Sequence, residues 1–217
     1  MRYRPGHRQQ SRERILEAAS QSFRTAGYNG VGVDGLAKAA GLTSGAFYGH
    51  FRSKAEAFRA AVVAGLQQLL AGVKSCRREH GSNWVAAFAD FYLSQKVTCA
   101  PAESCALPSL SPEVARADET SRLAYQDELL KLVDAIAAGL PATDSKKERR
   151  KAAWALLAQL AGAVMMARAV ADPKLATEIA SAVRRHIDTV SAPSQRLGRC
   201  DQMGRRSANC RIKYRFR

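Results

Sequence analysis

The sequence contains few acidic residues. It has 19 aspartates and glutamates against 34 lysines and arginines in 217 residues, which gives a formal net charge of +15 with histidine neutral. Such an excess is typical of proteins that bind a polyanion, because lysine and arginine release counterions when they meet phosphates. The alternative is a basic surface that is only solvated by water. Nucleic acid is therefore the first partner to consider.

The positive charge is concentrated at the two ends. Residues 1–14 carry a net charge of +4 and residues 193–217 carry +7, which leaves +4 for the rest of the chain. We predict a basic flexible arm over residues 1–10, which either enters a minor groove or makes no contact with DNA. Residues 192–217 lack helical periodicity and predict a basic disordered tail, which either binds nucleic acid weakly or has no role.

Long apolar runs and paired cysteines are also missing. The longest apolar segment, Ala152–Ala167, is shorter than the roughly 18 to 20 residues of a membrane span, and the N-terminus lacks the apolar region of a secretory signal. We therefore expect a cytoplasmic location. Five cysteines without CxxC spacing argue against a zinc module or a disulfide framework. No acid, base and nucleophile lie in a catalytic pattern, so we expect no enzyme, catalytic residue, metal or cofactor.

The alternation typical of β-strands is absent, whereas apolar residues recur every three or four positions. This periodicity predicts an all-α fold. Ser11 and Ser111 are candidate N-caps, and Ser53-Glu56 and Ser145-Glu148 have the spacing of capping boxes. About nine helices are expected: near residues 11–27, 33–40 and 43–50, a long one of about seven turns from residue 53, then near 83–98, 112–117 and 119–140, a long one from residue 145, and a last one from residue 173 to about 190.

The segment GLTSGAFYGHF, residues 41–51, lies between two helical patterns. Gly41 supplies the positive φ of a sharp turn, and Thr43 or Ser44 can cap the short helix that follows. A helix, a glycine turn and a second short helix form a helix-turn-helix, whose second helix lies in the major groove. The segment therefore predicts DNA binding.

The residue types in this short helix suit contact with a duplex. Small side chains let its backbone approach the sugar-phosphate wall, and hydroxyl or imidazole groups can form hydrogen bonds there. A lysine at the start of the next helix adds charge beside backbone amides suited to phosphate. For the histidine, a structural role is the alternative. The candidate DNA-binding residues are Thr43, Ser44, Gly45, Ala46, Tyr48, His50 and Lys54.

Residues 15–62, and above all GLTSGAFYGHFRSK, resemble the DNA-binding domain of the TetR family of one-component repressors. The resemblance implies a nine-helix dimer. Its N-terminal three-helix domain, here residues 11–56, binds DNA, and the remainder, here residues 57–191, binds a ligand and dimerises. The resemblance also places Phe47 in the core of the first domain. Gly32 stands where many relatives have Ser or Thr, which weakens the cap of the second helix.

The segment SCALPSLSPEVARADETSRLAYQDEL, residues 104–129, resembles the matching region of NemR-like members of that family. The resemblance implies that Cys105 stands where those proteins have a cysteine that responds to electrophiles and reactive chlorine, although Ser104 replaces the preceding glycine. A buried apolar cysteine is the alternative. Aromatic residues can line a ligand cavity between helices. The candidates are Trp84, Phe88, Phe91, Tyr125 and Trp154.

The last two long helices carry apolar stripes. Such stripes suit a helix pair doubled by a two-fold axis into a four-helix interface, or packing within one subunit. The predicted interface residues are Trp154, Leu157, Leu160, Val164, Ile179, Val183 and Ile187. We expect a homodimeric repressor of a palindromic operator, released by a small-molecule inducer or by modification of Cys105. The alternative is an architectural protein that binds nucleic acid nonspecifically through its basic ends.

Overall fold

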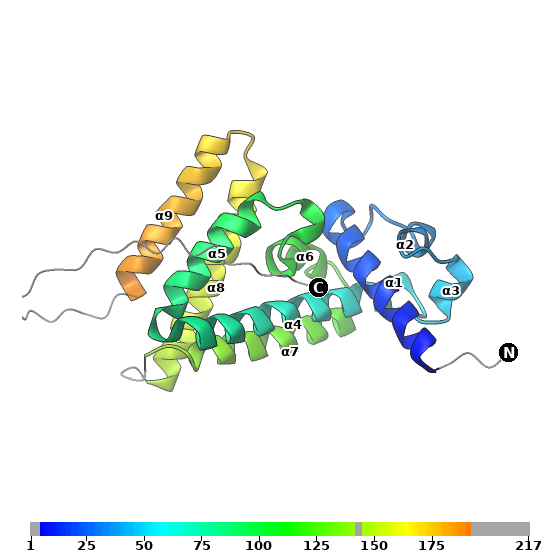
Figure 1. The fold of residues 1–217 in the computed structure, drawn as a ribbon, viewed down its shortest axis with the longest axis horizontal. Coiled ribbons are helices and arrows are strands. Elements are labelled where there is room, and N and C mark those ends of the chain that lie inside the picture. Colours follow the sequence, from blue (N-terminus) through cyan, green and yellow to red (C-terminus); the bar gives the residue numbers. More distant parts are fainter. Residues whose placement is uncertain (1–4, 142–144, 192–217) are drawn as a thin grey trace, which may run out of the picture.

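The computed structural model describes residues 5–141 and 145–191, and all regular secondary structure in them is helical (Figure 1). The all-α prediction is confirmed. The elements are α1 (Pro5–Ala26), α2 (Val33–Ala39), α3 (Ser44–Tyr48), α4 (Lys54–His80), α5 (Trp84–Thr98), α6 (Ala106–Val114), α7 (Glu119–Ala137), α8 (Lys146–Ala169) and α9 (Pro173–Ser191), with 3₁₀ turns η1 (Gly81–Asn83) and η2 (Pro101–Glu103).

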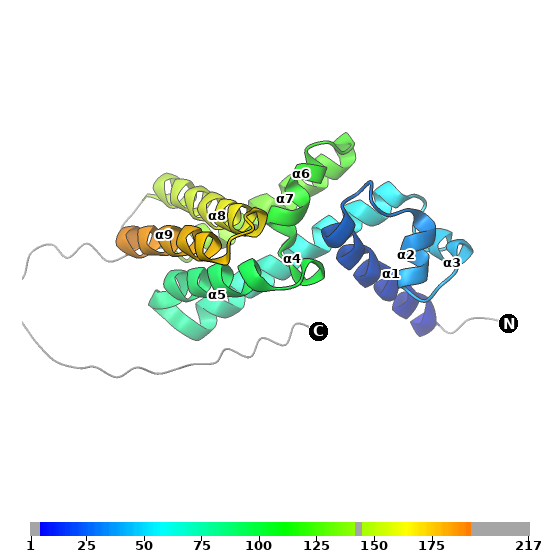
Figure 2. The same cartoon turned by 90° about the horizontal axis from the view of Figure 1, so that it is seen from above.

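Helices α1, α2 and α3 form one end of the molecule, and α4 leads from them into the other helices (Figure 1). Helix α7 lies along α4, while α5, α8 and α9 pack together at the far end, and α6 lies near the junction (Figures 1 and 2). One buried hydrophobic cluster extends from Ile15 in α1 to Ile187 in α9. The division of the chain near residue 56 stays a prediction, because α4 runs through it without a break.

Two glycines end the first two helices. Gly27 has a φ of 73°, and its N–H donates to the carbonyl of Phe23 at 3.0 Å. Gly41 has a φ of 67°; its N–H donates to Lys38 at 3.0 Å, and the N–H of Leu42 donates to Ala37 at 2.9 Å. The second pair of bonds is a Schellman motif, which favours glycine because of the positive φ. The sharp turn predicted at Gly41 is confirmed.

Hydroxyl side chains begin three of the helices. Thr43 accepts a hydrogen bond from the N–H of Ala46 at 3.2 Å, Ser53 accepts from Glu56, and Ser145 accepts from Glu148. The reciprocal half of the first predicted capping box differs, because the carboxylate of Glu56 accepts from the N–H of Arg52 at 2.8 Å. At the start of α2, Gly32 provides no side-chain cap, as expected for glycine.

Two predicted helix starts are wrong. Helix α1 begins at Pro5, since proline suits the first helical turn. Ser11 is therefore buried within the helix, and residues 5–10, which were predicted as part of the arm, are helical. Helix α6 begins at Ala106 and contains Pro112, although a helix was expected to start there. Proline has no N–H, so α6 lacks the bond that residue 112 would donate to the carbonyl of Pro108. The predicted tail, residues 192–217, lies outside the described residues.

Helix α8 is long and apolar enough to cross a membrane, judged by length and composition alone. Seven of its residues are buried against the rest of the described chain. Core helices of soluble proteins pass the same test. This helix is therefore weak support for a membrane location.

Candidate DNA-binding surface and ligand cavity

Helix α3 has one buried face and one exposed face. Phe47 is fully buried, whereas its neighbour Tyr48 is 57% exposed. The rings of Phe47 and Phe51 pack with centroids 5.7 Å apart, which anchors the short helix to its own domain. The placement predicted for Phe47 is confirmed. The outer face presents side chains suited to a duplex, namely the exposed Thr43, Gly45 and Tyr48 and the half-buried Ser44, Ala46 and His50.

A basic cluster, which we define as Arg8, Arg12 and His50, lies where α1 passes the end of α3. The guanidinium of Arg12 lies 4.9 Å from the centroid of the Phe51 ring, and Arg8 reaches the carbonyl of Gly49 with a long contact of 3.5 Å. Burial, followed by the charges of Arg8 and Arg12, lowers the pKa of His50 below 6.5. His50 is therefore harder to protonate in the free protein than an ordinary histidine.

His50 should make operator binding depend on pH. A phosphate beside the imidazole would raise its pKa, so DNA binding would take up a proton and affinity would rise as the pH falls from about 7 to 5. We expect up to about tenfold for each unit by which the pKa differs between the free and bound states. Titrations of the operator at several pH values measure this. His50→Gln should flatten the profile, and the exposed His186→Gln on α9 is the control; equal profiles for all three proteins would contradict the contact.

Two predicted DNA-contacting residues have partners inside the protein. The ammonium of Lys54 donates to the carbonyls of Tyr28 at 3.1 Å and Val31 at 3.3 Å, and it lies 4.2 Å from the centroid of the Tyr28 ring. The hydroxyl of Ser44 donates to the carboxylate of Asp34. Lys54 therefore fastens the α1–α2 turn to α4. The sequence did not indicate this contact. The DNA roles of Lys54 and Ser44 stay predictions.

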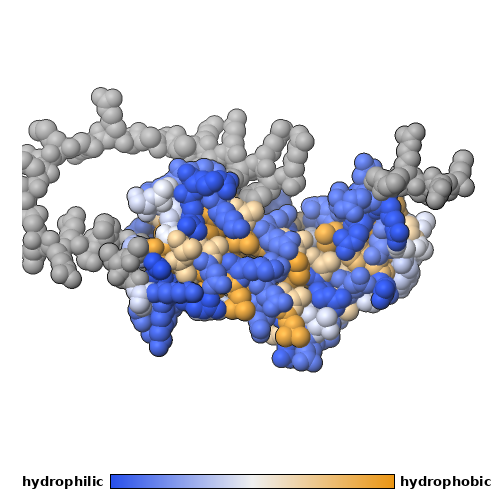
Figure 3. Space-filling model, turned by 90° about the horizontal axis from the view of Figure 1, so that it is seen from below, coloured by the Kyte–Doolittle hydropathy of each residue, from blue (hydrophilic) through white to orange (hydrophobic). Residues whose placement is uncertain are grey.

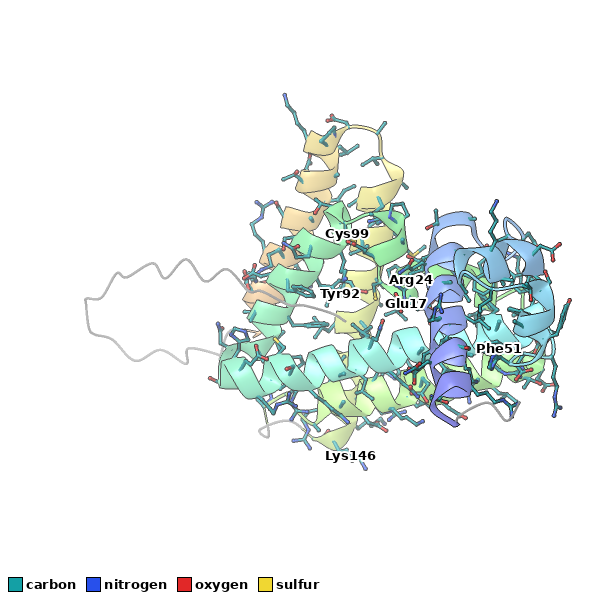
Figure 4. All side chains as sticks on the ribbon, turned by 45° about the vertical axis from the view of Figure 1, so that its right-hand side comes forward. Glu17, Arg24, Phe51, Tyr92, Cys99 and Lys146 are labelled. Atoms are coloured by element: carbon teal, nitrogen blue, oxygen red, sulfur yellow. The ribbon has the colours of Figure 1, made fainter. Side chains whose placement is uncertain are left out.

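A cavity of about 490 Å³ lies where α1 meets the C-terminal helices. Figure 4 shows Glu17 and Arg24 on α1, with Tyr92 and Cys99 from the α5 region across from them. The walls come from α1, α4, α5, η2 and the start of α6. The lining residues are Glu17, Gln21, Arg24, Gly65, Gln68, Leu69, Gly72, Phe88, Phe91, Tyr92, Gln95, Lys96, Cys99, Ala102, Glu103, Ser104, Cys105 and Ala106.

Of the six predicted ligand residues, Phe88, Phe91 and Cys105 line this cavity and the other three do not. Trp84 is buried, and its indole N–H donates to the carbonyl of Gly139 at 2.9 Å, so it secures the end of α7. Tyr125 pairs with Ser111 through their hydroxyls at 2.8 Å. Trp154 lies on the outside of α8 and is 38% exposed.

Cys105 is buried, and burial raises the pKa of its thiol, although Tyr92, the Leu107 amide, Lys96 and Arg24 act in the opposite direction. A raised thiol pKa disfavours the reactive thiolate. Cys99 is more exposed, and its sulfur lies 3.7 Å from a guanidinium nitrogen of Arg168. The same Arg168 donates to the carbonyl of Cys99 at 2.9 Å and so caps the end of α5.

The apolar stripe predicted for α8 faces inward. Leu157, Leu160 and Val164, together with Ile187 of α9, are buried in the chain's own core, so they cannot form an interface between subunits as predicted. Ile179 and Val183 are half-buried against that core. The outward face of the pair instead contains small and large apolar side chains. We call it the α8–α9 face and define it as Trp154, Ala155, Ala158, Gly162, Met165, Leu175 and Ala182.

Outside the α8–α9 face, exposed apolar side chains are scattered. Figure 3 shows one side of the molecule, on which hydrophilic side chains separate the hydrophobic patches. Leu123 on α7 is an isolated exposed apolar residue at 51% exposure. Scattered residues of this kind are usual on soluble proteins, whereas a continuous apolar face needs a partner.

Residues 15–61 match the model of the bacterial regulatory proteins of the tetR family. This segment includes α2, α3 and the exposed residues of α3 described above. Over this segment the chain is similar to the TetR family. The HTH-type transcriptional activator FasR of Mycolicibacterium smegmatis is 34% identical over 90 residues, which are 39% of this chain and 41% of FasR. The chain thus matches about two fifths of the length of this curated relative.

Solved structures share the fold over most of this chain. The reduced form of Escherichia coli NemR has a TM-score of 0.71 at 20% identity, covering 83% of this chain and 96% of NemR. Bacillus subtilis FadR in complex with stearoyl-CoA has a TM-score of 0.63 at 14% identity, covering 83% of this chain and 97% of FadR. At such identities these similarities concern the fold.

Proposed function

We propose that this protein is a homodimeric transcriptional regulator of the TetR family that binds a palindromic operator in the cytoplasm. The observation that carries the proposal is that α3 has one buried face and one exposed face. Phe47 fixes the helix to its domain, while Thr43, Gly45 and Tyr48 are exposed. The half-exposed His50 lies beside two arginines of α1, so positive charge flanks the face that would meet the phosphates. The opposite end of the molecule carries the face that we assign to dimerisation.

The α8–α9 face supports a two-fold dimer. Small residues at 155, 158 and 162 recur every three or four positions, which lets a second α8 approach closely. Two copies joined there would hold their α3 helices at a fixed spacing. A spacing of one helical turn, about 34 to 36 Å, matches successive major grooves of a palindrome.

A small molecule is the better candidate for the releasing signal than modification of Cys105. The cavity connects α1 with the C-terminal helices, so an occupant can favour one orientation of the DNA-binding domain over another. Cys105 is buried and has a raised thiol pKa, both of which suppress reaction with electrophiles. Cys105→Ser should therefore respond to inducer as the wild-type protein does. We propose repression as the outcome of DNA binding, although the FasR relative is named an activator.

Selection from a randomised duplex pool tests the proposal. The full chain should enrich one inverted repeat, and its affinity should fall with rising salt. Transcription in vitro from a promoter that contains the repeat would then distinguish repression from activation. Recovery of duplexes without a shared sequence would support the architectural alternative, in which the basic ends bind DNA nonspecifically.

A further inference from the structure

Two buried polar atoms carry the inference. Among the described residues, the side-chain nitrogen and oxygen atoms that are buried without a hydrogen-bond partner are Nε of Arg24 and Oη of Tyr92. Both residues line the cavity. An unpaired buried polar group is costly and rare in folded proteins. Because both residues border the same cavity, a ligand bound there is the candidate for the partner that these groups lack.

Both atoms are hydrogen-bond donors. Arginine stays protonated, and its fork of N–H groups has no acceptor. Burial, followed by the neighbouring Cys105, raises the pKa of Tyr92 well above its ordinary value, so the hydroxyl keeps its proton. The Cys105 thiol interacts with this hydroxyl but is a weak acceptor, so it satisfies the Tyr92 hydroxyl only in part. The ligand must therefore present an acceptor oxygen between α1 and α5.

The charge at Arg24 indicates an anionic acceptor. Burial lowers the pKa of Arg24, which shows a cation with incomplete solvation, and its only described hydrogen bond runs from Nη1 to the carbonyl of Ala102 at 3.0 Å. Among the described residues, neither carboxylate of the cavity forms a salt bridge with Arg24, although the charge of Glu17 attracts its guanidinium. Glu17 accepts from Gln21 at 2.7 Å, and Glu103 lies on η2. A carboxylate matches the planar guanidinium fork and restores the missing bonds.

The rest of the lining indicates the body of the ligand. Phe88, Phe91 and Leu69 provide apolar surface beside the two donors. A volume of about 490 Å³ holds a small molecule rather than a long chain. We propose that the cavity binds a small organic carboxylate with an aromatic or short aliphatic body, held by Arg24 and Tyr92.

This inference rests on the proposed function and deepens it. Arg24 belongs to α1, which packs against the helix-turn-helix, whereas Tyr92 belongs to α5 in the C-terminal helices. A carboxylate between them adds bonds across the junction. Its binding therefore favours one orientation of α1 over others, to the extent that its affinity differs between them. Operator affinity should change when the cavity is occupied.

The test uses the full chain and three probes, 2-naphthoate, 4-phenylbutyrate and octanoate, each beside its neutral amide. Calorimetry without DNA should show that at least one carboxylate binds and that its amide binds about tenfold or more weaker. Arg24→Gln should weaken carboxylate binding by about 10- to 100-fold and amide binding by less than about twofold. Tyr92→Phe should weaken carboxylate binding while raising the melting temperature of the empty protein, because a buried hydroxyl whose neighbour is only a weak acceptor is gone. A purely structural tyrosine would not combine these effects.

Gly72→Leu provides a variant that fills the cavity. A Cβ at Gly72 would meet no atom within 4 Å, whereas one at Gly65 would lie 2.3 Å from the Cβ of Ala106. Leucine at position 72 should therefore fold and exclude the probes. The proposal is overturned if no carboxylate binds at millimolar concentration, if the amides bind equally well, or if Arg24→Gln binds unchanged. Operator titrations of the same samples without probe separate these outcomes from a failure of DNA binding. With probe, wild-type operator affinity should change by about 5- to 150-fold.

Discussion

Tyr48→Ala should lower the affinity for the selected operator by about 5- to 150-fold, which corresponds to about 1 to 3 kcal/mol for a lost base contact. The side chain is 57% exposed and touches Phe47 only edge-on at 5.6 Å, so its removal should change the melting temperature little. Electrophoretic mobility shifts on operator and on scrambled duplexes measure both specific and nonspecific affinity. The affinity for the operator should fall more than the affinity for the scrambled duplex.

The control for Tyr48 is another exposed apolar residue. Leu123 is 51% exposed on α7, far from α3 in the chain, so Leu123→Ala removes a similar exposed side chain without touching the proposed groove contact. Its operator affinity should equal that of the wild-type protein. Tyr48→Phe separates the roles of the ring and the hydroxyl. If Tyr48→Ala and Leu123→Ala bind the operator alike, α3 does not face the DNA.

Gly162→Arg should convert the dimer into monomers. A Cβ at Gly162 would meet no atom within 4 Å in its own subunit, and replacing a helical glycine removes its conformational cost, so the subunit should stay folded. In the proposed dimer the same position faces a second α8. An unpaired charge buried there costs about 3 to 5 kcal/mol, which weakens dimerisation more than about 100-fold. Sedimentation velocity and operator titrations measure the result.

Two further variants separate the interface from the core. Gly162→Ala keeps a small side chain and should remain dimeric. Leu157→Ala should lower the free energy of unfolding by about 2 to 5 kcal/mol without separating folded subunits, because Leu157 is only 4% exposed within its own chain. A Gly162→Arg protein that still sediments as a dimer would place the interface elsewhere.

Local signals predicted much of the fold. The cap at Thr43 and the positive φ at Gly41 each depend on residues within a few positions, so the helix-turn-helix could be predicted from the sequence. The burial of Phe47 was implied by the family resemblance. The orientation of α8 could not be predicted. Its residues alternate between two apolar faces, and only packing against α5, α7 and α9 decides that Leu157 is inside and Trp154 outside.

Long-range contacts explain the other differences. Arg24 meets Ala102 from 78 positions away, and Lys54 meets Tyr28 from 26 positions away. A single sequence contains no pattern that predicts contacts at these separations. The cavity combines five segments, so its polar lining could not be predicted from the sequence. Two of its aromatic residues, Phe88 and Phe91, were predicted because both lie on one helix. The start of α1 at Pro5 had a signal, since proline favours the first turn of a helix.

Hydroxyl-radical footprinting of the full chain on the selected duplex tests the central claim most directly. Two α3 helices held by a dimer should protect two segments on one face of the DNA, centred about 10 to 10.5 base pairs apart or at a multiple of that spacing. The two halves should be related by the symmetry of the inverted repeat. Uniform protection without a fixed spacing, equal on duplexes of any sequence, would contradict the account.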